Sequence, residues 1–354
     1  MKRIRHTGLA VLCAWAVSLG AQSTPLVRYE ASHPAMGTVY VVAAYGRDRD
    51  YLAGVVGEVF DEIDRLDNQM SNYKPESELS GINREAGKRD VVVEPQFFQL
   101  LVDSYRYSQD TDGAFDITVG PLMKLWGFFR GQGRVPSQSE IEQVLHGVGY
   151  RHLKLNSSRH TVRFDTIGVE LDLGGIAKGY AVDRAVEILR SAGVTAALVS
   201  SGMSSIYALG SPPQERGWTV TLRDPYDAHK AADVLHLENY SLSTSGSYER
   251  FFKIGGKTYC HIMDPHTGRP VEGMLSTAVL ASTTLQSEAL SKPFFIWGPA
   301  RSRPYLATHA NLAVVFYQPG RKPPTFTRTI LRSNSFQLAP SQLAEISDRR
   351  GASN

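Results

Sequence analysis

The chain has 354 residues, of which 42% are hydrophobic and 21% are charged, and its formal net charge is +3. This composition is typical of a globular protein that is long enough to bury a substantial core. The basic residues are interspersed with acidic ones and form no stripe along the chain. The charge pattern therefore does not indicate nucleic-acid binding, and we expect no nucleic-acid partner.

The N-terminus has the pattern of a secretory signal peptide. Basic residues at positions 2, 3 and 5 precede an apolar run over residues 8–17, which is too short for a membrane span. Leu12 stands before Cys13, where a lipid-anchored protein would carry a small residue. We therefore expect residues 1–21 to be cleaved and the mature protein to be exported to a periplasm, where it could associate with the membrane.

Hydrophobic periodicity predicts strands and helices in irregular alternation, which favours an α+β fold with mixed β-sheets and flanking helices. Ser137 and Glu140 have the spacing of a capping box. Residues 26–335 would form this domain, and residues 336–354 a C-terminal tail. The predicted segments are strands around 26–44, helices at 52–70, 94–108 and 137–147, a hairpin at 152–165, a helix at 176–191, strands at 196–200, 206–209, 218–222, 242–244, 277–281 and 312–317, and a helix at 287–298.

One of the two cysteines, Cys13, lies in the predicted signal peptide. Cys260 is then alone in the mature chain, so an intramolecular disulfide is impossible. Cys260 precedes His261, which raises the question of a Cys/His nucleophile. Adjacent residues of an extended strand point to opposite faces, so we predict that Cys260 is a buried structural thiol.

Two segments contain candidates for phosphate chemistry. In residues 171–183, LDLGGIAKGYAVD, a predicted strand passes through two glycines into a helix, where backbone N–H groups and Lys178 would favour an anion. The segment is neither GxGxxG nor a Walker loop, and such a turn is more often structural. In residues 261–270, HIMDPHTGRP, ordinary turn chemistry explains most positions but leaves His261 unexplained.

Two further segments could hold a flat ring. Residues 113–128 combine a glycine turn, Asp116 and aromatic side chains that include Phe115. Residues 71–80 form a polar loop that contains Tyr73, which the periodicity does not assign to a core face. A buried core position for the aromatic residues and a surface position for Tyr73 are the simpler interpretations.

Six motifs follow one another along the chain: MGT (36–38), SNYKPESELSGIN (71–83), GAFDITVGPLMKLWGF (113–128), DLGGIAKGYAVD (172–183), TSGSYERFF (244–252) and HIMDPHTGRP (261–270). In this order they resemble the ApbE family of FAD:protein FMN transferases, and the resemblance covers nearly the whole mature chain. It implies an ApbE-like, T-fold-like architecture and an exported, magnesium-dependent enzyme. Such an enzyme binds FAD and moves its FMN half onto a Thr or Ser hydroxyl of an exported or membrane-bound flavoprotein, with release of AMP. FAD binding or hydrolysis without transfer is the alternative.

The resemblance also implies roles for individual residues. His261 would be the general base that takes the proton of the acceptor hydroxyl, and Asp264 would orient the turn or the imidazole. The remaining implied roles are flavin contacts by Met36 and Tyr73, a cofactor site lined by Ala114, Phe115 and Asp116, contacts of Asp172 and Lys178 to the adenosine or diphosphate side, a backbone contact from Ile262, and metal ligation by the Gly175 carbonyl and Glu288.

The chain departs from the family at the implied metal site. Relatives carry Asp-Ala-Leu-Ala-Thr, whereas this chain has Glu288 in place of the Asp and Lys292 in place of the Thr. An ammonium cannot coordinate a cation. Residues 201–205, SGMSS, also replace a Gly-Gly-Asp or Gly-Gly-Asn segment. Three interpretations follow: Glu288 and Gly175 still hold magnesium, Lys292 stands in for the metal charge, or the fold binds FAD or a partner without catalysis.

Overall fold

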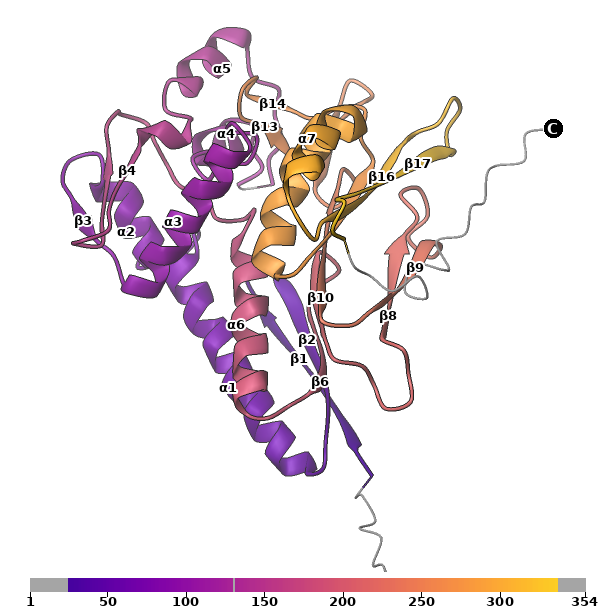
Figure 1. The fold of residues 1–354 in the computed structure, drawn as a ribbon. Helices are drawn as coiled ribbons and strands as arrows, with labels where there is room; N and C mark the ends of the chain where they lie inside the picture. Colours follow the sequence, from indigo (N-terminus) through magenta and orange to yellow (C-terminus); the bar gives the residue numbers. More distant parts are fainter. Residues whose placement is uncertain (1–24, 130, 337–354) are drawn as a thin grey trace, which may run out of the picture.

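The computed structural model describes residues 25–129 and 131–336, and it confirms the α+β class (Figure 1). The predicted signal peptide and all but the first residue of the predicted tail 336–354 lie outside the described residues. The helices are α1 Arg49–Met70, α2 Glu78–Glu85, α3 Pro95–Asp110, α4 Gly120–Leu125, α5 Gln138–Leu145, the 3₁₀ helix η1 Tyr150–His152, α6 Ala177–Ser191 and α7 Thr284–Thr308.

Within the described ranges, one large sheet has the strand order β1-β2-β6-β7-β10-β15-β16-β17. All neighbouring strands in it are antiparallel, whereas mixed sheets were predicted. A parallel pairing occurs among the described residues only as an isolated bridge between Val119 and Glu170, outside the named strands. The strands of this sheet are β1 Val27–Ala35, β2 Thr38–Gly46, β6 Ala196–Ser201, β7 Ser205–Leu209, β10 Tyr240–Gly246, β15 Ser276–Ala281, β16 Ala313–Pro319 and β17 Phe326–Arg332.

The large sheet is covered on both faces, because successive side chains of a strand point to opposite sides. On β2, Val42 and Ala44 pack in the core beneath α1 and α6, whereas Ala43 packs on the other side. Helices α1, α6 and α7 lie side by side on one face (Figure 1). A separate two-stranded ribbon, β8 Trp218–Arg223 and β9 Ala231–Leu237, covers the other face through Trp218 and Leu235.

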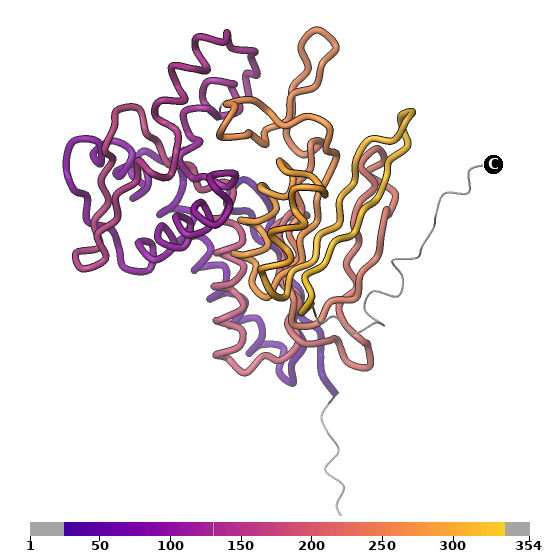
Figure 2. The backbone as a smooth tube through the Cα atoms, turned by 45° about the horizontal axis from the view of Figure 1, so that its top comes forward, coloured from indigo at the N-terminus to yellow at the C-terminus, as the bar shows by residue number. Residues whose placement is uncertain are grey.

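The chain between α1 and α6 builds a second layer beyond the ends of the strands (Figure 1). It contains α2 to α5 and a three-stranded sheet, β3 Val91–Val92, β5 Thr161–Phe164 and β4 Leu153–Asn156. Trp126 anchors this layer, because its indole N–H donates to the Gly268 carbonyl at 2.8 Å. Two small ribbons follow β10, namely β11 Phe251–Ile254 with β12 Lys257–Cys260, and β13 Met263–Asp264 with β14 Arg269–Pro270. Figure 2 shows the β11–β12 hairpin projecting from the body of the molecule.

Helices α6 and α7 approach each other closely at Gly179. A Cβ added there would lie 2.5 Å from the Thr284 carbonyl oxygen and 2.9 Å from Glu288 Oε2. The Asp183 carboxylate of α6 accepts the N–H groups of Thr284 at 2.7 Å and Leu285 at 2.8 Å, at the start of α7. These contacts fix the first turns of α7 against α6.

The segments predicted as strands, helices and hairpin are confirmed with shifted ends, and three expectations need correction. Residues 171–173 form no strand, because Leu171 pairs through its N–H and C=O with the Asn83 side chain rather than with a neighbouring strand. The loop predicted at 71–80 ends in helix α2. The last predicted helix starts earlier and runs to Thr308, across a kink at Gly298. None of the helices described here is long and apolar enough to cross a membrane.

The contact at Gly179 predicts opposite effects of two Gly→Ala substitutions. Gly179→Ala should destabilise the protein by about 1–3 kcal/mol, because the methyl group forces α6 away from α7. Gly54→Ala is the matched control on α1, where nothing lies within 4 Å of the added Cβ. It should stabilise the helix by about 0.5–1 kcal/mol. Urea unfolding of both variants measures the difference, and equal effects would contradict the close packing.

Candidate active site

A cavity of about 930 Å³ opens where the two layers meet. This volume lies at the upper end of the range of about 300–1,000 Å³ that is typical of small-molecule sites. Ten of the predicted site residues line it, namely Met36, Tyr73, Ala114, Phe115, Asp116, Asp172, Gly175, Lys178, Ile262 and His261. Asp264 and Glu288 do not line it, although Glu288 contacts two lysines that do.

The turn between β1 and β2 places Met36 at the cavity. Met36 and Gly37 have φ angles of 49° and 69°, the left-handed geometry of a tight two-residue hairpin turn. A methionine rarely adopts this conformation, so the turn holds it at some cost in backbone strain. The Tyr40 hydroxyl donates to the Met36 sulfur at 3.1 Å, which fixes the side chain.

The glycine turn before α6 lies on the cavity wall. Asp172 Oδ1 accepts the Gly174 N–H at 2.8 Å and closes the turn, and burial raises the pKa of this carboxyl. Lys178 is in the first turn of α6, as predicted, and lines the cavity. The two glycines leave the turn open toward the cavity, with only the Lys292 and Phe115 side chains close to Gly175.

His261 follows β12 and lies at the base of the projecting hairpin, where it lines the cavity. Its Nδ1 lies 3.2 Å from the Arg250 carbonyl oxygen. Because a carbonyl only accepts hydrogen bonds, Nδ1 carries the proton of the neutral ring, and Nε2 keeps the lone pair that a base needs. The pKa of His261 is lowered from 6.5 to about 4, mainly by burial and also by the charges of Lys178, Arg250 and Lys292, while the hydrogen bond with the Arg250 carbonyl opposes the shift.

Asp264 holds the turn after His261 rather than the imidazole. Its Oδ1 accepts the His266 N–H at 3.0 Å, and its carbonyl accepts the Gly268 N–H at 2.9 Å. The ring of His266 contacts the Asp112 carbonyl at 2.8 Å and joins the turn to the second layer. Of the two roles that the resemblance implies for Asp264, the geometry supports orientation of the turn. Asp264 is therefore a positioning residue.

Asp116 is committed to the structure of the second layer. Its Oδ1 accepts from the N–H and the hydroxyl of Thr118 at 2.8 and 2.7 Å, and its Oδ2 accepts the Tyr150 N–H at 2.6 Å. Burial raises the pKa of this carboxyl. The neighbouring Ala114 and Phe115 are also buried while they line the cavity. Residues 114–116 therefore form a buried, hydrogen-bonded part of the cavity wall.

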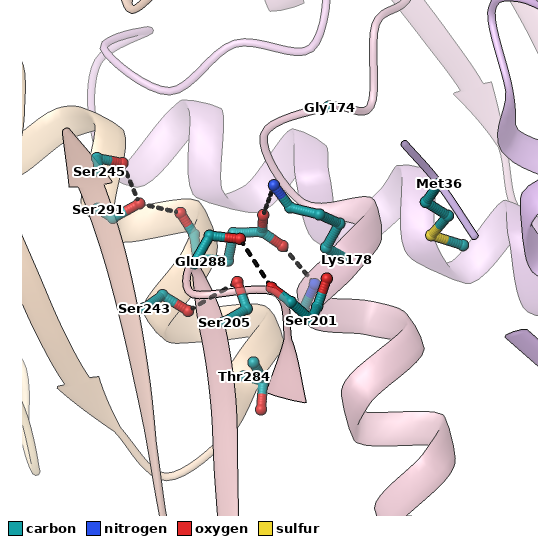
Figure 3. A network of polar contacts seen from close by, with 12 residues as sticks. Met36, Gly174, Lys178, Ser201, Ser205, Ser243, Ser245, Thr284, Glu288 and Ser291 are labelled. Atoms are coloured by element: carbon teal, nitrogen blue, oxygen red, sulfur yellow. Dashed lines mark hydrogen bonds and ion pairs between the residues drawn. The ribbon is translucent and has the colours of Figure 1, made fainter. Parts of the chain in front are cut away.

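Glu288 lies at the centre of a charged cluster (Figure 3). It is only 2% exposed, and its Oε2 accepts the Gly179 N–H of α6. Its Oε1 lies 3.8 Å from Lys178 Nζ and 3.7 Å from Lys292 Nζ. The Lys292 ammonium also donates to the Glu288 carbonyl at 3.1 Å. Burial lowers the pKa of Lys292 to about 8, although Glu288 opposes that shift.

A seam of hydroxyl groups sets the rotation of α7 and so aims this cluster (Figure 3). Ser243 of β10 lies 2.8 Å from the Ser287 hydroxyl, and Ser245 lies 2.8 Å from the Ser291 hydroxyl. All four side chains are buried. Because α7 presents Ser287 and Ser291 to the sheet, the adjacent Glu288 faces α6 and the adjacent Lys292 lines the cavity.

The donors around Glu288 do not fit a divalent cation. Magnesium requires several oxygen ligands at about 2.0–2.1 Å. One carboxylate oxygen is already bound to a backbone N–H, and the other faces two ammonium groups. On the other predicted ligand, a Cβ added to Gly175 would lie 3.5 Å from Lys292 Cε, so the lysine fills the adjoining space. In the part of the chain that the structure describes, no cluster of three or more His, Cys, Asp or Glu side chains could hold a metal.

Aromatic side chains also line the cavity. Tyr73 is 61% exposed and stacks on Phe129, with ring centroids 4.4 Å apart and planes within 5°. Phe128 and Met123 also line the cavity. Asn72 lies next to them, and its buried Oδ1 has no hydrogen-bond partner among the described residues. An acceptor with no partner at a cavity wall suits a ligand N–H.

The sequence reasoning missed several cavity residues. Arg250 and Glu249 stood within a quoted motif without an assigned role, and both line the cavity. Asn72 stood beside Tyr73 in another motif, and its polar type in a loop was the available signal. Phe129 carried no signal of its own, because the ring pair forms only in three dimensions. Cys260 is buried and its pKa is raised by burial, as expected for a structural thiol.

Comparisons with known proteins identify a family. Residues 36–316 match the family model described as the ApbE family. A protein of Escherichia coli (strain K12) named FAD:protein FMN transferase is 31% identical over 274 residues, which are 76% of this chain and 78% of that protein. A protein of Treponema pallidum with the same name is 30% identical over 310 residues, which are 83% of this chain and 85% of that protein.

Solved structures of ApbE proteins have a similar fold. The crystal structure of an ApbE protein from Thermotoga maritima superposes with a TM-score of 0.78 at 30% identity, over 87% of this chain and 97% of that one. The flavin transferase ApbE from Vibrio cholerae superposes with a TM-score of 0.75 at 26% identity, over 88% and 99% of the two chains.

The environment of His261 predicts an unusually acidic imidazole. NMR titration of the histidine ring signals should show His261 neutral until the pH falls to about 4, with its signal assigned by His261→Gln. Its folded-state pKa lies below the ordinary 6.5, so the neutral ring contributes stability above pH 6.5 that is lost as the pH falls through about 4. Lys178→Met should raise this pKa. Protonation near pH 6.5 would contradict the described burial.

Proposed function

The chain belongs to the ApbE family, and we propose that it is an FAD:protein FMN transferase that moves FMN from FAD onto a Thr or Ser hydroxyl of a partner flavoprotein and releases AMP. One observation carries the proposal. A single cavity brings the glycine turn before α6 together with His261, whose Nε2 is the ring nitrogen left to accept a proton.

Two groups of cavity residues suit the two parts of FAD. The aromatic residues Tyr73 and Phe129 offer faces on which a flavin ring can stack. The cationic residues Lys178 and Lys292 suit the diphosphate. Met36 also lines the cavity. We therefore place the reacting phosphorus between the glycine turn and His261.

The reaction follows from this placement. The acceptor hydroxyl attacks the FMN phosphorus and loses its proton to Nε2 of His261. A new O–P bond forms, the bond between the two phosphates breaks, and its electrons leave with the AMP phosphate. Positioning and neutralisation of charge are the main contributions that a protein makes to such a transfer. Asp264 contributes by fixing the turn that follows His261.

The setting of the reaction is also proposed. The signal-peptide pattern of residues 1–21 supports export to a periplasm, so the acceptor would be an exported or membrane-bound flavoprotein. The β11–β12 hairpin ends directly before His261 and projects from the body of the molecule (Figure 2), so it would offer a surface to a protein partner. FAD binding or hydrolysis without transfer is the second candidate, and the free Nε2 beside the cavity favours transfer over simple binding.

The test combines FAD with the exported-protein fraction of the producing organism after deletion of this gene. The purified protein should produce a flavin-fluorescent band that survives denaturing electrophoresis, together with an equal amount of AMP. His261→Gln should slow both by about two to four powers of ten, since it removes the general base. His152→Gln, at an exposed histidine paired with Asp165 outside the cavity, should leave the rate unchanged. AMP without a fluorescent band would identify a hydrolase instead.

A further inference from the structure

The charges of Lys178, Lys292 and Glu288 at the cavity form an arrangement that the family resemblance does not explain. Two ammonium groups, on Lys178 and Lys292, reach it from different helices and share one carboxylate oxygen of Glu288. The lysine side chains are 25% and 23% exposed and both line the cavity, whereas the Glu288 side chain is 2% exposed. The ligand would thus meet the two cations and not the anion that holds them.

The sum of these charges favours an anion. Two ammonium groups and one carboxylate leave a net charge of one positive unit, and the opposite charges of Arg250 and Glu249, which line the same cavity, offset each other. The attraction of both lysines to the shared carboxylate offsets their mutual repulsion, so both ammonium groups stay at the cavity. Both lysines also depress the pKa of His261, so their charges act on the position where the transfer is proposed to occur.

The two ammonium groups are held in fixed positions. The Gly179 N–H and the hydroxyl seam hold Glu288, and Glu288 in turn holds both ammonium groups. A buried carboxylate with fixed partners is a rigid anchor. Both lysine side chains are thus held in place without a bound metal ion.

We propose that Lys178 and Lys292, anchored by Glu288, form a metal-independent binding site for the diphosphate of a nucleotide. This inference rests on the proposed function, because the diphosphate is that of FAD. During transfer the two ammonium groups would neutralise the charge that grows on the departing AMP phosphate, while His261 takes the proton. The bond changes are those already given, and no divalent ion takes part.

The first test uses ADP as a probe that has the diphosphate but no flavin. Isothermal titration calorimetry should give the same ADP affinity in EDTA and in millimolar Mg²⁺. Lys292→Thr should weaken ADP binding in EDTA by about ten- to a hundredfold, since each charge-assisted contact of this kind contributes about 1.5–3 kcal/mol. Lys292→Arg should retain most of the affinity, because it keeps the charge.

Controls separate the lysine from general damage. Lys154→Thr, at an exposed lysine paired with Asp165, should not change ADP binding. Thermal unfolding of Lys292→Thr should remain cooperative, and Lys292→Arg provides a second variant if it does not. The proposal is overturned if wild-type ADP affinity rises tenfold or more on adding Mg²⁺, or if Lys292→Thr and Lys292→Arg both bind as the wild type does.

The FMN-transfer assay in EDTA and in Mg²⁺ distinguishes this proposal from the proposed function. Transfer at equal rates in both buffers supports the metal-independent site and the transferase assignment. Transfer only with Mg²⁺ overturns the metal-independent site and leaves the transferase assignment intact. Absence of transfer in both buffers, with ADP binding that depends on Lys292 and not on Mg²⁺, removes the transferase assignment and leaves the diphosphate site.

Discussion

The active site depends on one buried carboxylate. Glu288 accepts the Gly179 N–H and lies within 4 Å of the Lys178 and Lys292 ammonium groups, so it joins α6, α7 and the cavity at a single point. Burying a charge is costly unless it is paired and hydrogen-bonded, and here every partner is supplied by residues fixed elsewhere. The Gly179 N–H and the two ion pairs together hold the Glu288 carboxylate in one position.

The same constraint connects packing to chemistry. Gly179 lacks a side chain, so α6 and α7 approach closely enough for the carboxylate to reach a backbone N–H. The hydroxyl seam between β10 and α7 sets the helix rotation that aims positions 288 and 292. The cations that result lie near His261, whose ring stays neutral because burial and positive charge both oppose its protonation. The two lysine charges therefore help to keep the His261 ring neutral.

Much of this could be predicted from the sequence, for physical reasons. The helical period of α1 and the alternation of β1 and β2 are local patterns, as is the capping box at Ser137. The glycine turn before α6 was recognisable because two glycines directly precede a helical pattern, although such a turn is more often structural. The missing strand at residues 171–173 was not, because the Asn83 side chain takes the place of a strand partner, and that contact joins distant parts of the chain. The substitution at Lys292 was visible, but the carboxylate shared with Lys178 emerges only when α6 and α7 pack together.

The central claim is that Lys178 and Lys292 bind the diphosphate without a divalent ion. A crystal structure of the protein with ADP and Mn²⁺ tests it most directly, because manganese substitutes for magnesium and has an anomalous signal. We predict diphosphate oxygens within ion-pairing distance of both the Lys178 and Lys292 ammonium groups, and no anomalous peak beside Glu288. A manganese ion bound to Glu288 and the Gly175 carbonyl, with the Lys292 side chain displaced, would contradict the account.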